Sequence, residues 1–128
     1  MDKELREKGL AVRKAVLGAD HVERSFKNAD DFTMPFQELI TEYCWGAVWT
    51  REGLPRKTRS LLNLGMLSAL NRPTELKMHV RGALNNGVTR EEIREVFLQV
   101  TIYCGVPAAM ESFRLAREVF DEIDGKSR

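Results

Sequence analysis

Apolar residues recur at spacings of three and four along nearly the whole chain, the pattern of helices with one buried side. No stretch alternates between apolar and polar positions as a half-buried strand would. We therefore predict an all-α fold of about six helices joined by short linkers that make neighbours antiparallel. The expected helices cover residues 2–17, 32–49, 55–70, 73–86, 89–104 and 107–123, and a short segment lies at 20–27.

Glycines, prolines and a capping motif mark where these helices begin and end. Gly18 and Gly87 follow two of the periodic stretches and suit a helix stop, and Pro73 suits a first helical turn. Thr89 and Glu92 have the spacing of a capping box. The segment 61–70 is apolar nearly all round, which is typical of a helix that is buried or wedged between subunits. In the segment 32–49 we expect one apolar face, formed by Phe36, Leu39, Ile40, Tyr43 and Ala47.

Length and charge narrow the class of protein. The chain has 128 residues, so we expect one domain over 1–128, with an N-terminal helix within 1–18 and a frayed tail at 124–128. A net charge of +1 gives no reason to expect a nucleic-acid partner. No apolar run reaches the roughly 18 residues of a membrane span, and the charged start has no signal-peptide core, so we predict no membrane and a cytoplasmic location.

Cysteine and histidine usage argues against a metal or a redox pair. Cys44 and Cys104 are far apart and form no Cys-x-x-Cys motif. Two histidines, His21 and His79, are few for a zinc or iron site. We expect reduced structural thiols, no metal and no cofactor.

The start of the helix at 73–86 is the first candidate for chemistry. Arg72, Glu75 and His79 have the spacing i, i+3 and i+7, which places a cation, an acid and a base on one helical face beside an apolar stripe. A histidine beside an apolar face is more often a satisfied core or interface residue than a catalyst. On this helix alone the structural interpretation has the stronger prior.

Two tryptophans and a basic turn are the other candidates. Trp45 and Trp49 are four residues apart, so they are core anchors or the wall of an apolar pocket with Arg51 at its mouth. The first turn of the helix at 55–70 carries Arg56, Lys57 and Arg59, where the helix dipole disfavours basic residues. That conflict indicates a nearby anion or acidic partner, although a solvated basic turn is the commoner explanation.

Four runs together resemble the carboxymuconolactone decarboxylase family: WGAVWTREGL (45–54), KTRSLLNL (57–64), ELKMHVRGALNNGVT (75–89) and YCGVPAA (103–109). The resemblance covers about residues 16–122. The wider family includes alkylhydroperoxidase D-like proteins, in which a Cys-x-x-Cys pair precedes the histidine. Here Arg72 and Glu75 stand where those cysteines would be, so thiol peroxidase chemistry is disfavoured.

The resemblance implies a homo-oligomer, commonly a hexamer and otherwise a trimer, that converts 4-carboxymuconolactone to the enol-lactone of 3-oxoadipate without a cofactor. This step belongs to the protocatechuate branch of the β-ketoadipate pathway of aromatic degradation. Within that reaction we expect His79 and Glu75 to be catalytic. Substrate contacts are expected from Arg72, Arg51, Trp45, Trp49 and Tyr103. A related decarboxylase or lactone enzyme acting on another small acid, and a non-catalytic helical oligomer, remain open as alternatives.

Overall fold

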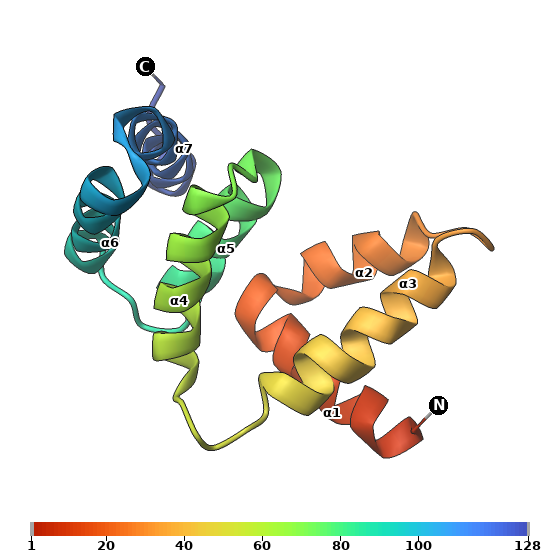
Figure 1. Ribbon diagram of the computed structural model, residues 1–128. Coiled ribbons are helices and arrows are strands. Elements are labelled where there is room, and N and C mark those ends of the chain that lie inside the picture. The colour runs from red at the N-terminus through yellow and green to blue at the C-terminus, as the bar shows by residue number, and fades with distance from the viewer. Residues whose placement is uncertain (1, 128) are drawn as a thin grey trace. The chain divides into compact units, whose positions relative to one another are not determined.

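The computed structural model describes residues 2–127, and every regular element in that range is helical, which confirms the predicted all-α class (Figure 1). The segment at 19–27, left unassigned from the sequence, is a helix of its own. The elements are α1 (Lys3–Leu17), α2 (Ala19–Lys27), α3 (Met34–Leu39), the π-helix η1 (Ile40–Val48), α4 (Arg56–Ala69), α5 (Pro73–Asn85), α6 (Arg90–Cys104) and α7 (Val106–Asp124). The chain forms two compact units, one up to Arg56 and one from Lys57, and each is described by itself.

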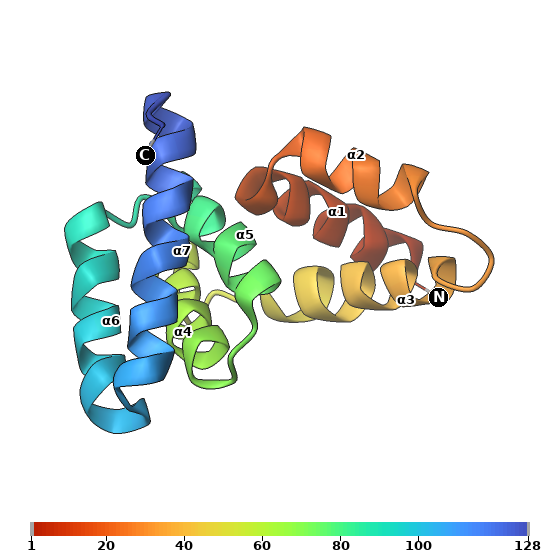
Figure 2. The same ribbon diagram turned by 90° about the horizontal axis from the view of Figure 1, so that it is seen from above.

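In the first unit, α1 packs directly on η1 because glycines let the two backbones touch (Figure 2). A Cβ atom on Gly9 would lie 2.0 Å from the carbonyl oxygen of Thr41, and one on Gly46 would lie 2.5 Å from that of Leu5. No side chain fits at either position, so this close crossing depends on both glycines.

The face that η1 buries differs from the predicted one. Phe36, Leu39 and Tyr43 are 58%, 48% and 56% exposed. The buried residues of this segment are instead Thr41, Glu42, Trp45, Gly46 and Trp49. Phe36 and Leu39 lie on the α-helix α3, before the π-helix begins. From Ile40 onward the prediction assumed α-helical geometry, whereas Ile40–Val48 is a π-helix with i→i+5 hydrogen bonds, such as Trp49 N–H to Cys44 C=O at 3.0 Å. Thr41, Trp45 and Trp49 all contact α1, because Thr41 accepts a hydrogen bond from Arg13 and both tryptophans pack with Val12 and Val16.

Two arginines of α1 tie it to the same segment. Arg6 donates to the buried carboxylate of Glu42 at 3.3 Å. Arg13 is 4% exposed and donates to Thr41 Oγ1 at 3.1 Å and to Gln37 Oε1 at 2.9 Å. Burial lowers the pKa of the Arg13 guanidinium from its usual value. Neutral acceptors thus bind its two terminal nitrogens, whereas its buried Nε has no hydrogen-bond partner among the described residues.

The second unit has its own core. Its fully or nearly fully buried members come from all four helices and from the loop between α5 and α6, which contributes Val88: Leu64, Leu76, Val80, Ala83, Val88, Ile93, Phe97, Leu115, Ala116 and Val119. The predicted stripe of α5 is confirmed by Leu76, Val80 and Ala83. α4 is not buried on all sides within this chain, because it buries Ser60, Leu64 and Ser68 on one side and leaves Leu62, Met66 and Leu70 about half exposed or more. The alternative that this helix is wedged between subunits stays a prediction.

Helix ends and ion pairs connect the elements of this unit. The capping box of Thr89 and Glu92 is confirmed. The Glu92 carboxylate oxygen Oε2 also lies 3.1 Å from Nζ of Lys57. One basic residue in the first turn of α4 therefore has an acidic partner, as its unfavourable position in the helix dipole suggested.

No described helix is both long and apolar enough to cross a membrane.

Part of the tail predicted to be frayed makes hydrogen bonds to the rest of the second unit, and its fraying stays a prediction. Asp124 is the last residue of α7 and accepts two hydrogen bonds from Arg90, at 2.9 and 2.8 Å. The backbone N–H of Lys126 then bonds to the carbonyl of Asp121, after a left-handed turn at Gly125. The parts of our terminal predictions that concern Met1 and Arg128 lie outside the described residues.

Candidate active site

His79 is the buried polar residue of α5 and the centre of the candidate site. It lies between the core residues Leu76 and Val80 in sequence and is 9% exposed. Its Nδ1 atom is 3.5 Å from Nδ2 of Asn63 on α4. An amide nitrogen can only donate, so Nδ1 accepts in this pairing, and a neutral imidazole then has its proton on Nε2. The second ring nitrogen is thus a donor.

Arg72 and Glu75 do not share the burial of His79. Both side chains are exposed. Arg72 precedes the helix as its N-cap, with φ −112° and ψ 80°, because a residue before proline is excluded from helical geometry. Its Nη1 donates to the carbonyl of Leu70 at 3.4 Å. The expectation that all three residues share one helical face is therefore wrong for Arg72, and only His79 is drawn into the core.

Trp45 and Trp49 form a buried stacked pair in the first unit. Their ring centroids are 4.8 Å apart with an interplanar angle of 26°, and they pack with Val12 and Val16. Their predicted role as core anchors is confirmed by exposures of 4% and 5%. Their role as a pocket wall stays a prediction. Trp49 does line a surface depression of about 430 Å³ together with the exposed Arg51.

Tyr103 lies at the end of α6 in the second unit and is 82% exposed. It borders an open apolar groove of about 400 Å³ between α4 and α6, which we call the α4/α6 groove. The residues that line it are Thr58, Leu61, Leu62, Gly65, Met66, Val96, Gln99, Val100, Tyr103 and Cys104. All of these residues are uncharged, so Tyr103 has apolar neighbours in this groove and no charged side chain beside it.

Asn63 is the residue that the sequence analysis missed. It is the amide residue of the segment 61–70, which is apolar apart from Asn63 and the small Ser68, and that amide was the available signal. Its importance comes from α4 lying against α5, which periodicity alone does not reveal. Neither metal nor thiol chemistry gains support here. Residues 2–127 contain no group of three or more His, Cys, Asp or Glu placed to hold a metal. Cys44 is exposed by its surface area, but the surrounding protein atoms partly desolvate its thiol and raise the thiol pKa, against a lesser opposite effect of Arg13.

Comparison with known proteins places the chain in a family. The pattern described as the carboxymuconolactone decarboxylase family matches residues 35–118. The chain belongs to the carboxymuconolactone decarboxylase family. The matched segment runs across the boundary after Arg56, so it includes parts of both units.

Two relatives of similar length have the same sequence identity to this chain. It is 46% identical over 122 residues to the 4-carboxymuconolactone decarboxylase of Acinetobacter baylyi, covering 95% of this chain and 91% of the relative. It is also 46% identical over 126 residues to the nitrosuccinic acid decarboxylase of Metarhizium robertsii, covering 98% and 88%. Both names describe decarboxylases, and they differ in substrate.

Proposed function

We propose that the protein is a cofactor-independent carboxy-lyase that converts 4-carboxymuconolactone to the enol-lactone of 3-oxoadipate. The observation that carries this proposal is the 46% identity, over 95% of the chain, to an enzyme named for that substrate. The reaction would place the protein in the protocatechuate branch of the β-ketoadipate pathway.

The chemistry of this lactone explains how a protein could act without a coenzyme. The leaving carboxylate is attached to a carbon that is conjugated through a double bond to the lactone carbonyl. When carbon dioxide departs, the electron pair moves into that carbonyl and gives a dienolate. Protonation at the carbon next to the carbonyl then gives the enol-lactone. The protein has to bind a dianion, stabilise charge on one oxygen and supply one proton.

Nitrosuccinic acid is the second candidate substrate, because the relative named for it is equally identical and covers 98% of the chain. It too is a dicarboxylic acid with its own electron sink, since the nitro group accepts the electron pair when the neighbouring carboxylate leaves. The two candidates therefore require the same three tasks from the protein. They differ in shape and in the oxygen on which negative charge develops.

His79 is our candidate for the proton or oxyanion donor. Its burial places the imidazole where a hydrogen bond to a developing anion is strong, and the pairing with Asn63 orients the ring with a proton on Nε2. Glu75, one turn earlier on α5, would orient His79 or share the proton. Its exposure is compatible with exchanging that proton with water.

Arg72 and Arg51 are our candidates for holding the substrate carboxylates, since a guanidinium binds a carboxylate through two parallel hydrogen bonds. Both side chains are exposed and accessible to a ligand. Trp45, Trp49 and Tyr103 would supply apolar walls. The depression shared by Trp49 and Arg51 supports that pairing of an apolar wall with a cation.

We also propose that the chain assembles with copies of itself. The α4/α6 groove is lined only by uncharged residues, and Leu62, Met66 and Tyr103 on it are 49%, 52% and 82% exposed. An apolar surface of this kind is typical of an interaction site. A second copy would meet no like charge there.

Turnover of the two acids by purified protein tests the proposal. We expect carbon dioxide release from 4-carboxymuconolactone, and a His79→Ala variant should lose about 10²–10⁴-fold in kcat if His79 is the general acid. The control is His21→Ala, which removes the other histidine of the chain, on α2 of the first unit, and should leave kcat unchanged.

The possible outcomes separate the alternatives. Turnover of nitrosuccinic acid alone would replace the first candidate substrate by the second. A folded His79→Ala protein with normal kcat would remove His79 from the mechanism. Absence of turnover with both acids would refute both candidate substrates and leave either another small acid or the non-catalytic oligomer. Altered assembly of the His79→Ala variant would then favour the oligomer.

A further inference from the structure

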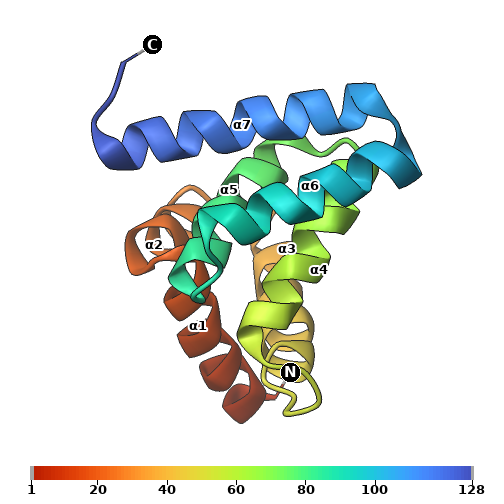
Figure 3. The same ribbon diagram turned by 90° about the vertical axis from the view of Figure 1, so that its left-hand side faces the viewer.

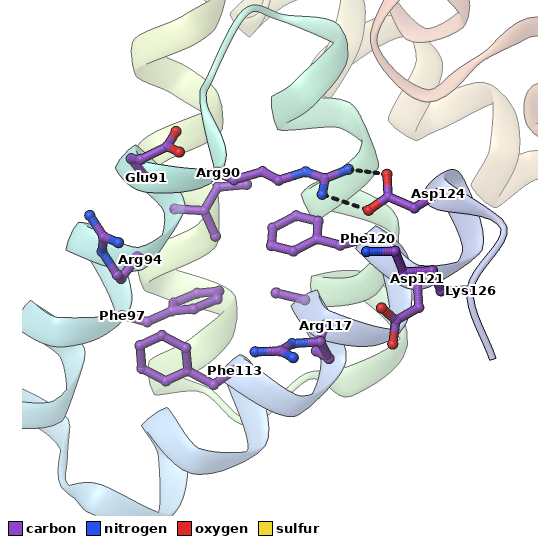
Figure 4. A pocket seen from close by; sticks show the side chains of 12 residues that line it. Arg90, Glu91, Arg94, Phe97, Phe113, Arg117, Phe120, Asp121, Asp124 and Lys126 are labelled. Atoms are coloured by element: carbon purple, nitrogen blue, oxygen red, sulfur yellow. Dashed lines mark hydrogen bonds and ion pairs between the residues drawn. The ribbon is translucent and has the colours of Figure 1, made fainter. Parts of the chain in front are cut away.

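α6 and α7 lie side by side in the second unit (Figure 3). A second concave site is lined by residues of these two helices and by Lys126, and its lining includes neither His79 nor any residue proposed to act with it (Figure 4). The two antiparallel helices leave a pocket of about 400 Å³, which we call the α6/α7 pocket. This volume falls within the range of small-molecule sites. Its lining residues are Arg90, Glu91, Ile93, Arg94, Phe97, Phe113, Ala116, Arg117, Phe120, Asp121, Asp124 and Lys126.

The floor of the pocket is apolar and its walls are aromatic. Ile93, Phe97 and Ala116 form a buried base with exposures of 1%, 0% and 3%. Phe113 stands edge-on to Phe97, with ring centroids 5.5 Å apart and an interplanar angle of 77°, and remains 38% exposed. A large ring that stays this exposed beside a hollow offers a flat ligand an aromatic contact.

Two arginines of the pocket differ in their partners: Arg90 is bound to a carboxylate, whereas Arg117 has no such partner in the described part of the chain. Two hydrogen bonds to Asp124 hold Arg90 and raise the pKa of its guanidinium above its usual value. The same group lies 4.5 Å over the ring of Phe120. Arg117 has no hydrogen bond or ion pair to any of residues 2–127. Figure 4 shows its guanidinium group pointing toward the rings of Phe113 and Phe97, into the pocket.

An unpaired guanidinium beside aromatic rings is suited to one kind of ligand. The pocket is lined by four cationic and three acidic side chains, so it has one positive charge in excess. A carboxylate would form two parallel hydrogen bonds with Arg117, and a ring attached to it would contact Phe113 over the apolar floor. A ligand with more than one negative charge would be repelled by the acidic side chains of the pocket, and a neutral ligand would form no ion pair with Arg117.

We propose that the α6/α7 pocket binds a small aromatic monocarboxylate, with Arg117 as the carboxylate receptor. The site is separate from the proposed decarboxylase site, and its argument does not depend on the proposed function. The ligand is recognised by the combination of one negative charge and a flat apolar body.

Titration of the full-length protein with sodium benzoate, at constant ionic strength, tests the proposal. NMR signals of the Arg117 Nε–H and the Phe113 ring should shift and saturate. Benzamide has the same shape without the charge, and it should bind at least about tenfold more weakly, because hydrogen bonds to charged groups are the stronger ones. An Arg117→Gln variant should lose benzoate affinity by a similar factor.

Arg114→Gln is the matched control. Arg114 lies one turn earlier on α7 but pairs with Glu111 and Glu118 outside the pocket, so its loss should leave benzoate binding unchanged. The proposal is overturned if benzoate causes no saturable shift, or if benzamide or the Arg117→Gln variant binds equally well. It is also overturned if the Arg117 signal shifts with protein concentration alone, since a second copy then covers the pocket. None of these outcomes bears on decarboxylation.

Discussion

The close crossing of α1 and η1 makes a sharp prediction for Gly9→Ala. The added Cβ would lie 2.0 Å from the Thr41 carbonyl oxygen and 2.7 Å from the Gly46 nitrogen, whereas ordinary contacts begin at 3.4 Å. Both neighbours are backbone atoms that cannot rotate away. The helices must therefore separate by roughly 1 Å, a gap that forfeits a quarter to a half of each dispersion contact along the seam.

The size of the effect follows from two opposing contributions. Overpacking of this kind costs about 1–3 kcal/mol and occasionally more, and a 2.0 Å approach belongs at the upper end. Replacing a helical glycine by alanine contributes about 0.5–1 kcal/mol in the other direction. We expect Gly9→Ala to lower the free energy of unfolding by roughly 2–3 kcal/mol. Gly65→Ala on α4, where a Cβ meets nothing within 4 Å, should raise it by about 0.5–1 kcal/mol.

Tryptophan fluorescence is the appropriate assay. Both tryptophans of the chain, Trp45 and Trp49, are packed in the first unit, so their emission during denaturation follows that unit. Gly9→Ala should shift the fluorescence transition to lower denaturant and redden the native spectrum, while Gly65→Ala should do neither. A Gly9→Ala protein as stable as wild type would refute the backbone contact on which the reasoning depends.

Two further predictions concern acid stability and assembly. Hydrogen bonds from Lys77 and, to a lesser extent, Arg81 hold the pKa of Glu122 below its usual value, so the stability they confer is present at neutral pH and is lost as pH falls below about 4.5. Between pH 7 and pH 3 the Tm of Glu122→Gln should therefore fall less steeply than that of the wild type, and equal slopes would contradict this. Met66→Lys in the α4/α6 groove should reduce the mass of the assembly measured by sedimentation velocity. Leu98→Lys is the control, since Leu98 on α6 is about as exposed as Met66 but lies outside the groove, and it should leave that mass unchanged. A monomeric wild type, or equal masses in all three proteins, would contradict assembly through this groove.

Periodicity predicted most helices of this protein because local rules agree with the final packing. Thr89 and Glu92 illustrate this, since a capping box depends on residues three apart and nothing else. The burial of His79 beside Leu76 and Val80 was also predictable from spacing on α5.

The predictions failed where the wrong helical geometry was assumed for a segment, or where a residue's contacts come from a part of the chain distant in sequence. Tyr43 was assigned to the buried face because α-helical geometry was assumed for a segment that forms a π-helix. Arg72 was placed on the helix although Pro73 excludes it from helical geometry. Asn63 was overlooked because its contact with His79 joins residues sixteen positions apart on different helices.

The π-helix has a consequence for how homologous chains are aligned with this one. Since a π-helix fits more residues into each turn than an α-helix, losing one amino acid within Ile40–Val48 can relax the coil to the common form while rotating everything downstream. A single-residue gap in this stretch would thus change the direction in which Trp49 points without shortening any loop. Sequences that carry such a gap are expected to present a different aromatic surface to whatever they bind.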